Sequence, residues 1–204
     1  MLTLISIIIL IFSVILHEVA HGYMANWLGD PTARLAGRLS LNPVKHIDPV
    51  GSIIVPLITS LGGFTFGWAK PVPYNPYNLK DRRTGELLVA LAGPASNLLI
   101  AIIFGTILRF VAVGAASPAT IAAVTVVSYI VLINIVLAIF NLIPLPPLDG
   151  SKILFFFFKD QYGRARMTLE RYSYVFVLVV VFFLWQIISP IIPWVFHLFT
   201  GFYL

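Results

Sequence analysis

Hydrophobic residues in this chain occur in long, nearly uninterrupted runs. The first run extends from Leu2 to Leu28, and no ionisable side chain interrupts it before His17. At ~1.5 Å per residue, a helix over this run is roughly 40 Å long, which is enough to cross a bilayer. Two later runs, Leu87–Ala112 and Ala119–Phe140, also predict membrane-spanning helices. The pattern therefore predicts an all-α polytopic membrane protein.

Two other apolar segments are less regular. Val50–Leu61 is short and contains Pro56, which favours a re-entrant or interfacial element over a full span. Tyr174–Phe199 is long enough to cross, although two prolines loosen it. We expect about four to six transmembrane helices in all, together with a re-entrant or hairpin element near residues 50–80.

Composition agrees with a membrane protein. The 204 residues are 59% hydrophobic and only 10% charged, with a mean hydropathy of +0.97. A soluble fold could not bury so much apolar surface. The chain has no cysteine, so a zinc ion could be held only by His, Asp or Glu side chains. We expect a single transmembrane domain over residues 1–204, embedded in the lipid bilayer.

The net charge of +5 does not indicate a nucleic-acid partner, because the basic residues are not gathered into one patch. Their positions along the chain instead predict which loops lie on the cytoplasmic side of the membrane. All 13 lysines and arginines except Arg109 fall on the cytoplasmic side if the amino terminus lies outside. This assignment requires Val50–Leu61 not to change sides. It places His17 and His21 toward the cytoplasm in a multi-pass protein, which we expect in a prokaryotic cell membrane.

The most informative motif is His17-Glu18-Val19-Ala20-His21, inside the first apolar run. Ionisable groups at membrane depth are costly and usually functional. On a helix, His17 and His21 lie one above the other, so both imidazoles can reach one metal ion. In zinc hydrolases of this pattern, the glutamate acts as the general base. A catalytic zinc needs a third protein ligand from elsewhere in the chain.

Asp149 is the strongest candidate for the third ligand. It follows a group of prolines that must end the preceding helix near Phe140, and irregular backbone at membrane depth has to line a protein cavity. On local sequence alone, a plain helix-capping aspartate is an equally good interpretation. The lack of a better third ligand favours a His-His-Asp site with water in the fourth position.

Together, these motifs resemble those of the site-2 protease family of intramembrane zinc metalloproteases. The resemblance covers most of the chain and is carried by three motifs: His17–His21, Gly93-Pro94-Ala95-Ser96-Asn97 and Asn141–Gly150. It implies that His17, His21 and Asp149 hold one Zn²⁺ per chain, with Glu18 as general base. Asn141, eight residues before Asp149, would steady the substrate or its oxyanion.

The same resemblance implies regulated intramembrane proteolysis of transmembrane protein substrates. We take Asn97, Trp68 and Pro144 as candidate substrate-binding residues. Trp68 lies in Phe66–Pro76, whose alternation and prolines predict an extended segment that could pair with an unwound substrate. An interfacial anchor is an equally good interpretation of that segment, and tight helix packing is a slightly better one for the motif that contains Asn97.

Two further polar residues receive structural interpretations. Asn134 lies near the same helix face as Asn141, where an interhelical hydrogen bond is the favoured use. His46 would compete with Asp149 as a ligand and is taken as a loop residue near the site.

Three other functions stay open. A metal transporter would need a through-path of ligands. A prenyl-protein type zinc protease would take a later glutamate, Glu86 or Glu170, as its third ligand. A non-catalytic membrane scaffold would not need the intact His-Glu-x-x-His motif.

Overall fold

A computed structural model describes residues 2–55, 57–58, 69–111, 117–157, 163–173, 175, 183 and 185–203. Within these residues the chain is helical and forms no strand. The long helices are α1 (Leu2–Trp27), α4 (Arg82–Val111) and α5 (Pro118–Asn141). Shorter helices are α2 (Thr32–Leu35), α6 (Gly150–Phe157), α7 (Gly163–Arg171), α9 (Trp185–Ile188) and α10 (Ile191–Thr200). Single turns are η1 (Pro43–His46), η2 (Pro49–Ile54) and η3 (Pro76–Asn78).

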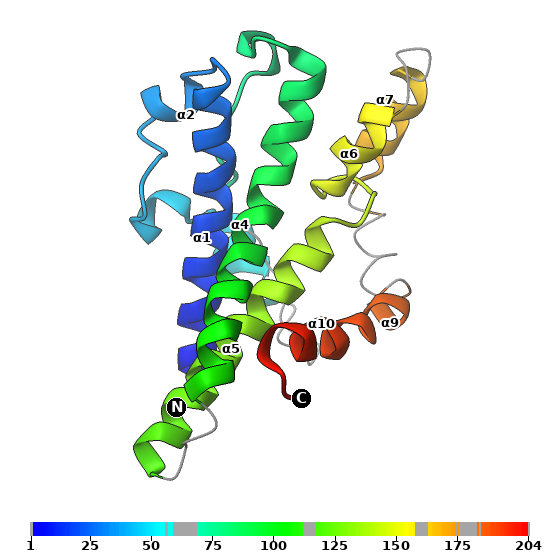
Figure 1. Ribbon diagram of the computed structural model, residues 1–204. Coiled ribbons are helices and arrows are strands. Elements are labelled where there is room, and N and C mark those ends of the chain that lie inside the picture. The colour runs from blue at the N-terminus through cyan, green and yellow to red at the C-terminus, as the bar shows by residue number, and fades with distance from the viewer. Residues whose placement is uncertain are drawn as a thin grey trace.

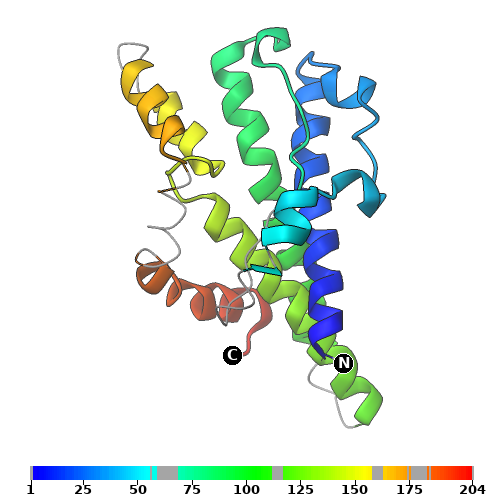
Figure 2. The ribbon, with the colours of Figure 1, turned by 180° about the vertical axis from the view of Figure 1, so that it is seen from behind.

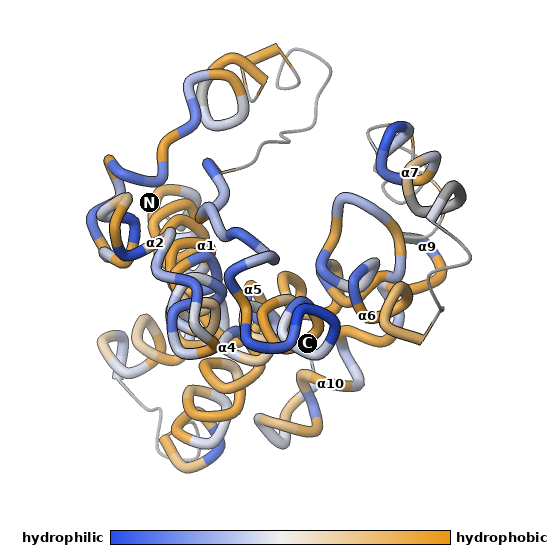
Figure 3. Tube along the Cα trace, turned by 90° about the horizontal axis from the view of Figure 1, so that it is seen from above, coloured by the Kyte–Doolittle hydropathy of each residue, from blue (hydrophilic) through white to orange (hydrophobic). Residues whose placement is uncertain are grey.

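The long helices form the framework of the protein (Figure 1). α1, α4 and α5 are each long and apolar enough to cross a membrane. Seen from above, their tubes are mostly hydrophobic all round (Figure 3). Large apolar side chains such as Leu4, Leu99 and Phe110 are exposed on the outside. A helix that is apolar on every face is typical of a membrane span, which confirms the predicted fold class.

Side-chain caps explain where two of these helices begin. α4 starts at Arg82, before the apolar run, because Asp81 accepts hydrogen bonds from the amides of Arg83 and Thr84. α5 starts after Ser117, which forms a reciprocal capping box with Thr120. Each helix therefore begins where the chain supplies partners for its first amide groups.

The described part of the predicted span Tyr174–Phe199 does not form one long helix. Its residues form α9 and α10, which lie across the other helices at one side of the framework (Figure 1). Ile192 and Phe196 of α10 pack into the apolar cluster of α4 and α5. Most of residues 174–184 lie outside the described residues, so the number of spans stays a prediction.

The predicted re-entrant segment begins as η2, which lies beside the middle of α1 in both side views (Figures 1 and 2). Asp48 caps this turn by accepting from the amides of Val50 and Gly51. Ile54, Leu57 and Ile58 are exposed, as lipid-facing side chains would be. Residues 59–68, which hold the rest of the segment and Trp68, lie outside the described residues.

A buried carboxylate ties the end of α1 to the segment before α4. Asp30 follows α1, and its Oδ2 accepts from the amide of Asn75 at 2.6 Å. Its Oδ1 accepts from the amide of Thr32 and from Nδ2 of Asn78. Burial alone would raise the pKa of the Asp30 carboxyl, but these hydrogen bonds outweigh it and hold the pKa below its ordinary value.

This carboxylate should lose its stabilising effect in acid. A group with a lowered folded pKa stabilises the fold above its unfolded pKa, about 4, and the effect is lost as pH falls through the folded pKa. We expect Asp30→Asn to lower the thermal unfolding midpoint at neutral pH in detergent. The difference from wild type should shrink once the pH drops below about 4. A difference that does not change with pH would show that the charge of Asp30 is not what stabilises the fold.

Candidate metal centre

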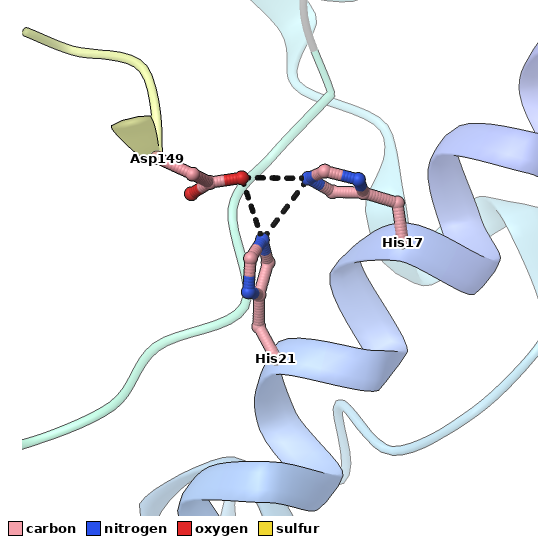
Figure 4. A group of neighbouring side chains, drawn as sticks. All are labelled: His17, His21 and Asp149. Atoms are coloured by element: carbon pink, nitrogen blue, oxygen red, sulfur yellow. Dashed lines mark hydrogen bonds and ion pairs between the residues drawn. The ribbon is translucent and has the colours of Figure 1, made fainter. Parts of the chain in front are cut away.

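The centre is built on the second half of α1. His17 and His21 lie one turn apart on this helix and point to the same side (Figure 4). His17 is buried, and the side chain of His21 is 11% exposed. The two imidazoles therefore lie on one face of the helix, as predicted.

Asp149 reaches the histidines from the loop between α5 and α6. α6 begins at Gly150, directly after it. A side chain at Gly150 would collide with the carbonyl oxygens of Leu142 and Ile143, so the loop can fold back only with glycine there. At the far end of α6, Arg83 of α4 donates to the carbonyl oxygen of Phe156 at 2.6 Å. These contacts hold the start and end of α6, and so place Asp149.

The three side chains converge on one point (Figure 4). Oδ2 of Asp149 lies 3.1 Å from Nε2 of His17 and 3.2 Å from Nε2 of His21. The two Nε2 atoms are 3.0 Å apart. Zinc bonds of about 2.0–2.1 Å at tetrahedral angles place neighbouring ligand atoms roughly 3.3 Å apart. The triangle thus has the size of one face of a zinc coordination tetrahedron.

Hydrogen bonds behind the imidazoles leave both Nε2 atoms available as ligands. Nδ1 of His21 lies 2.6 Å from the carbonyl oxygen of Val89, which can only accept, so Nδ1 carries the proton. Nδ1 of His17 lies 2.6 Å from Oδ1 of Asn97, another acceptor. Each neutral ring then has a lone pair on Nε2. Oδ2 of Asp149 is buried without a hydrogen-bond partner. Three electron-rich atoms therefore face one another, and a shared cation would remove their repulsion.

Gly93 allows α4 to approach the histidines. A Cβ atom at this position would lie 2.5 Å from Cε1 of His21 and 2.6 Å from Cε1 of His17. Side chains of any size are therefore excluded from this point of α4. The packing interpretation of the Gly93-Pro94 motif is confirmed, and its reason is close contact with the two imidazoles.

Glu18 points toward an extended segment, residues 69–75. Its Oε2 accepts from the amide of Val72 at 2.8 Å. Arg38, itself buried, donates to the carbonyl oxygens of Lys70 and Pro71. The amide of Lys70 donates to the carbonyl oxygen of His46. Sequence reasoning missed Arg38 and Val72, because neither belongs to a recognisable motif.

The other predicted site residues lie as follows. Asn97 is fully buried and faces His17, so it lies behind a candidate ligand and not on a surface that a substrate could reach. Asn141 donates to the carbonyl oxygen of Leu137 in its own helix. Pro144 is exposed in the loop that leads to Asp149. Trp68 lies outside the described residues.

The competing ligands are placed elsewhere. Nε2 of His46 lies 2.7 Å from the carbonyl oxygen of Ser40, and His46 does not belong to the metal-binding group found in the described chain. Glu86 pairs with Arg82 at 3.0 Å, and Glu170 lies 3.5 Å from a nitrogen of Lys152. Within the described residues, the group that could hold a metal is His17, His21 and Asp149.

A buried group of two histidines and one aspartate inside a framework of membrane-spanning helices is typical of a membrane-embedded metalloenzyme. The chain belongs to peptidase family M50, whose model matches residues 5–118 and 105–186. This membership confirms the resemblance to the site-2 proteases. The chain is therefore a zinc metalloprotease, and zinc is its cofactor.

Relatives agree with this assignment. The chain is 41% identical to "Putative zinc metalloprotease YwhC" of Bacillus subtilis, over 87% of this chain and 78% of the relative. It is 30% identical to "Putative zinc metalloprotease Rip2" of Mycobacterium tuberculosis, over 82% of this chain and 62% of the relative. It is 26% identical to "Zinc metalloprotease MJ0392" of Methanocaldococcus jannaschii, over 79% of this chain and 36% of the relative. No solved structure matches the chain significantly.

Proposed function

We propose that this zinc metalloprotease hydrolyses peptide bonds within or near transmembrane segments of other membrane proteins. The observation that carries the proposal is the position of the His17, His21 and Asp149 group. Both histidines lie on a helix that is long and apolar enough to span the membrane, and this helix continues beyond His21 to Trp27. A scissile bond has to come to this depth to be cleaved. Such an activity would serve regulated intramembrane proteolysis.

The residues have distinct roles in the proposed reaction. His17, His21 and Asp149 hold the metal. Zinc, when bound, supplies a Lewis acid that polarises the peptide carbonyl and makes water a better nucleophile. Glu18 takes a proton from the attacking water and passes it to the nitrogen of the leaving amine. Its bond to Val72 engages only Oε2, which leaves Oε1 to carry that proton.

Asn141 is proposed to help with the charge that develops on the carbonyl oxygen. Its amide now bonds to Leu137 within α5, and this bond is local enough for the side chain to turn toward a substrate. An amide donor near a developing oxyanion typically contributes about 3–4 kcal/mol to transition-state stabilisation. Pro144 lies exposed in the loop between Asn141 and Asp149, where a substrate would pass.

Residues 69–75 are proposed to receive the substrate backbone. The segment is extended, and it is held by Arg38 on one side and by Glu18 on the other. Helical substrates hide their peptide groups in internal hydrogen bonds, so a substrate must unwind before its carbonyl can reach the metal. Pairing with an extended segment beside Glu18 would compensate the unwound substrate for the hydrogen bonds it loses.

We propose that the amino terminus lies outside and that the centre faces the cytoplasm. The basic segments around α2 and α7 lie toward the same end of the protein, where α4 also begins (Figures 1 and 2). Arg109 lies near the opposite end of α4. Because the chain has no cysteine, Ala119→Cys and Met167→Cys provide clean reporters. An impermeant maleimide added to intact cells should label only the first; labelling of only the second would reverse the topology.

The activity can be tested in proteoliposomes with single-span substrates. Two matched substrates would differ only by a helix-breaking pair of residues at the centre of the span. We expect cleavage of the broken-helix substrate inside its span, located by the masses of the products. A chelator should stop cleavage, and added zinc should restore it. Cleavage confined to water-exposed tails, at the same rate for both substrates, would contradict the proposal.

Metal transport is the alternative function that makes a specific structural demand on the chain. It needs ligands along a path through the membrane. In the part of the chain that is described, metal-binding side chains gather in one group at one level. Zinc flux into the same proteoliposomes is a direct check, and we expect none.

A further inference from the structure

A chain of buried amides runs from α5 to the metal centre. Nδ2 of Asn97 donates to Oδ1 of Asn134 at 2.8 Å. Nδ2 of Asn134 donates in turn to Oγ of Ser13 at 2.9 Å and to the carbonyl oxygen of Ile130 at 2.8 Å. Asn97 and Asn134 are both 0% exposed. The predicted interhelical hydrogen bond of Asn134 is therefore present, and it belongs to a network that joins α1, α4 and α5.

The network determines which way each amide points. Nδ2 of Asn134 has two acceptors, one of them a backbone carbonyl that cannot donate, so Oδ1 must face Asn97. Asn97 then has to present Nδ2 to that oxygen, and its own Oδ1 is left facing His17. Nδ2 of Asn97 also donates to the carbonyl oxygen of Ser13 at 3.4 Å, a longer bond that favours the same orientation. The bond to Asn134 is the shorter of the two and so contributes more to holding the amide in place. Water is scarce at this depth, so a reversed Asn97 would leave its oxygen facing Oδ1 of Asn134 with no donor to bond.

The orientation of Asn97 decides the tautomer of His17. With Oδ1 facing the ring, Nδ1 carries the proton and Nε2 keeps the lone pair that points at Asp149. A reversed Asn97 would present its NH₂ group to Nδ1. His17 would then carry its proton on Nε2, the atom that faces Asp149 and His21, and could not bind a metal there.

We infer that Asn134 is a positioning residue for the metal centre, which acts through Asn97 to keep His17 in its metal-binding tautomer. The inference rests on the proposed ligand role of His17. It gives Asn134 a function beyond holding helices together, although its hydrogen bonds go to Asn97, Ser13 and Ile130 and not to a proposed metal ligand. Partners behind a ligand of this kind typically contribute 10–100-fold to metal affinity.

Two substitutions of Asn134 separate this role from simple packing. Asn134→Leu has a similar volume but removes the nearer acceptor of Asn97, leaving only the carbonyl oxygen of Ser13 at 3.4 Å. Asn134→Asp keeps a carbonyl oxygen for Asn97, while it places an acidic group in an apolar region. If Asn134 acts by orienting Asn97, the aspartate variant should retain zinc and the leucine variant should not. If it serves only packing, the aspartate variant should be the worse of the two.

The experiment measures zinc affinity of the purified full chain by competition with a chelator, and the visible spectrum of the cobalt-substituted protein. We expect Asn134→Leu to bind zinc roughly 10–100-fold more weakly and to lose the tetrahedral cobalt bands. Asn134→Asp should stay close to wild type in both. Ile135→Ala is the matched control, because Ile135 is the next residue of α5, is 0% exposed and packs in an apolar cluster. It should lower thermal stability and leave zinc affinity unchanged.

The outcomes distinguish the inference from the proposed function. If wild type binds zinc and Asn134→Leu binds it equally well, the positioning role is wrong and the ligand assignment stands. If Asn134→Leu and Ile135→Ala lose zinc to the same extent, the effect is loss of structure and the inference is again overturned. If wild type itself binds no zinc, the ligand assignment is wrong.

Discussion

Glu18→Gln should abolish peptide cleavage and leave zinc bound. The glutamine side chain has the same shape, and its carbonyl oxygen can still accept the hydrogen bond from the amide of Val72. It cannot take a proton from water at neutral pH. General acid–base catalysis contributes about 10²–10⁴-fold to such reactions, so we expect a loss of at least that size. Product formation in proteoliposomes and zinc content of the purified chain are the two measurements.

Glu170→Gln provides the matched control for this change. It removes the same charge from an exposed position on α7, where Glu170 lies 3.5 Å from a nitrogen of Lys152. This variant should cleave at the wild-type rate. Equal cleavage by Glu18→Gln and Glu170→Gln would remove Glu18 from the mechanism. Loss of zinc from Glu18→Gln would instead show that this residue helps to form the metal centre.

Gly93→Ala should disable the metal centre through one added methyl group. The new Cβ would lie within 2.6 Å of both imidazole rings, so either α4 or the histidines must move. Overpacking of this kind typically costs about 1–3 kcal/mol. If that energy is taken from metal binding, zinc affinity falls roughly 10–100-fold, and cleavage falls with it.

A second glycine of the same helix tests whether the effect is local. A Cβ at Gly105 would lie 2.9 Å from Cβ of Phe199, far along α4 from the histidines. Gly105→Ala should therefore lower the thermal unfolding midpoint without changing zinc affinity. If Gly93→Ala binds zinc as tightly as wild type, the tight contact between α4 and the imidazoles has no part in forming the centre.

Sequence reasoning identified the main features of the centre because their causes are local. The spacing of His17 and His21 follows from helix geometry alone. The prolines before Asp149 end α5 wherever it packs, so a loop near that level could be expected. The apolar runs required long helices, and α1, α4 and α5 are those helices.

Other features depend on contacts that no local pattern contains. Asn97 was predicted to bind substrate, but its neighbours come from α1 and α5, and only the packed structure brings them to it. Val72 donates to Glu18, and Arg38 donates to the carbonyl oxygens of the two residues before Val72. Both contacts depend on the path of this segment, which bonds to Asp30 and His46 further along. The end of the chain was read as one span from its hydropathy, whereas Pro190 divides its described part into α9 and α10.

The central claim is that His17, His21 and Asp149 bind one zinc ion together. X-ray absorption at the zinc edge, on the purified full chain with and without Asp149→Ala, tests it most directly. For wild type we predict one zinc per chain, with imidazole nitrogens and a carboxylate oxygen at about 2.0–2.2 Å. In the variant we predict loss of zinc or loss of that oxygen. A wild-type chain without zinc, or an identical coordination shell in both proteins, would contradict the account.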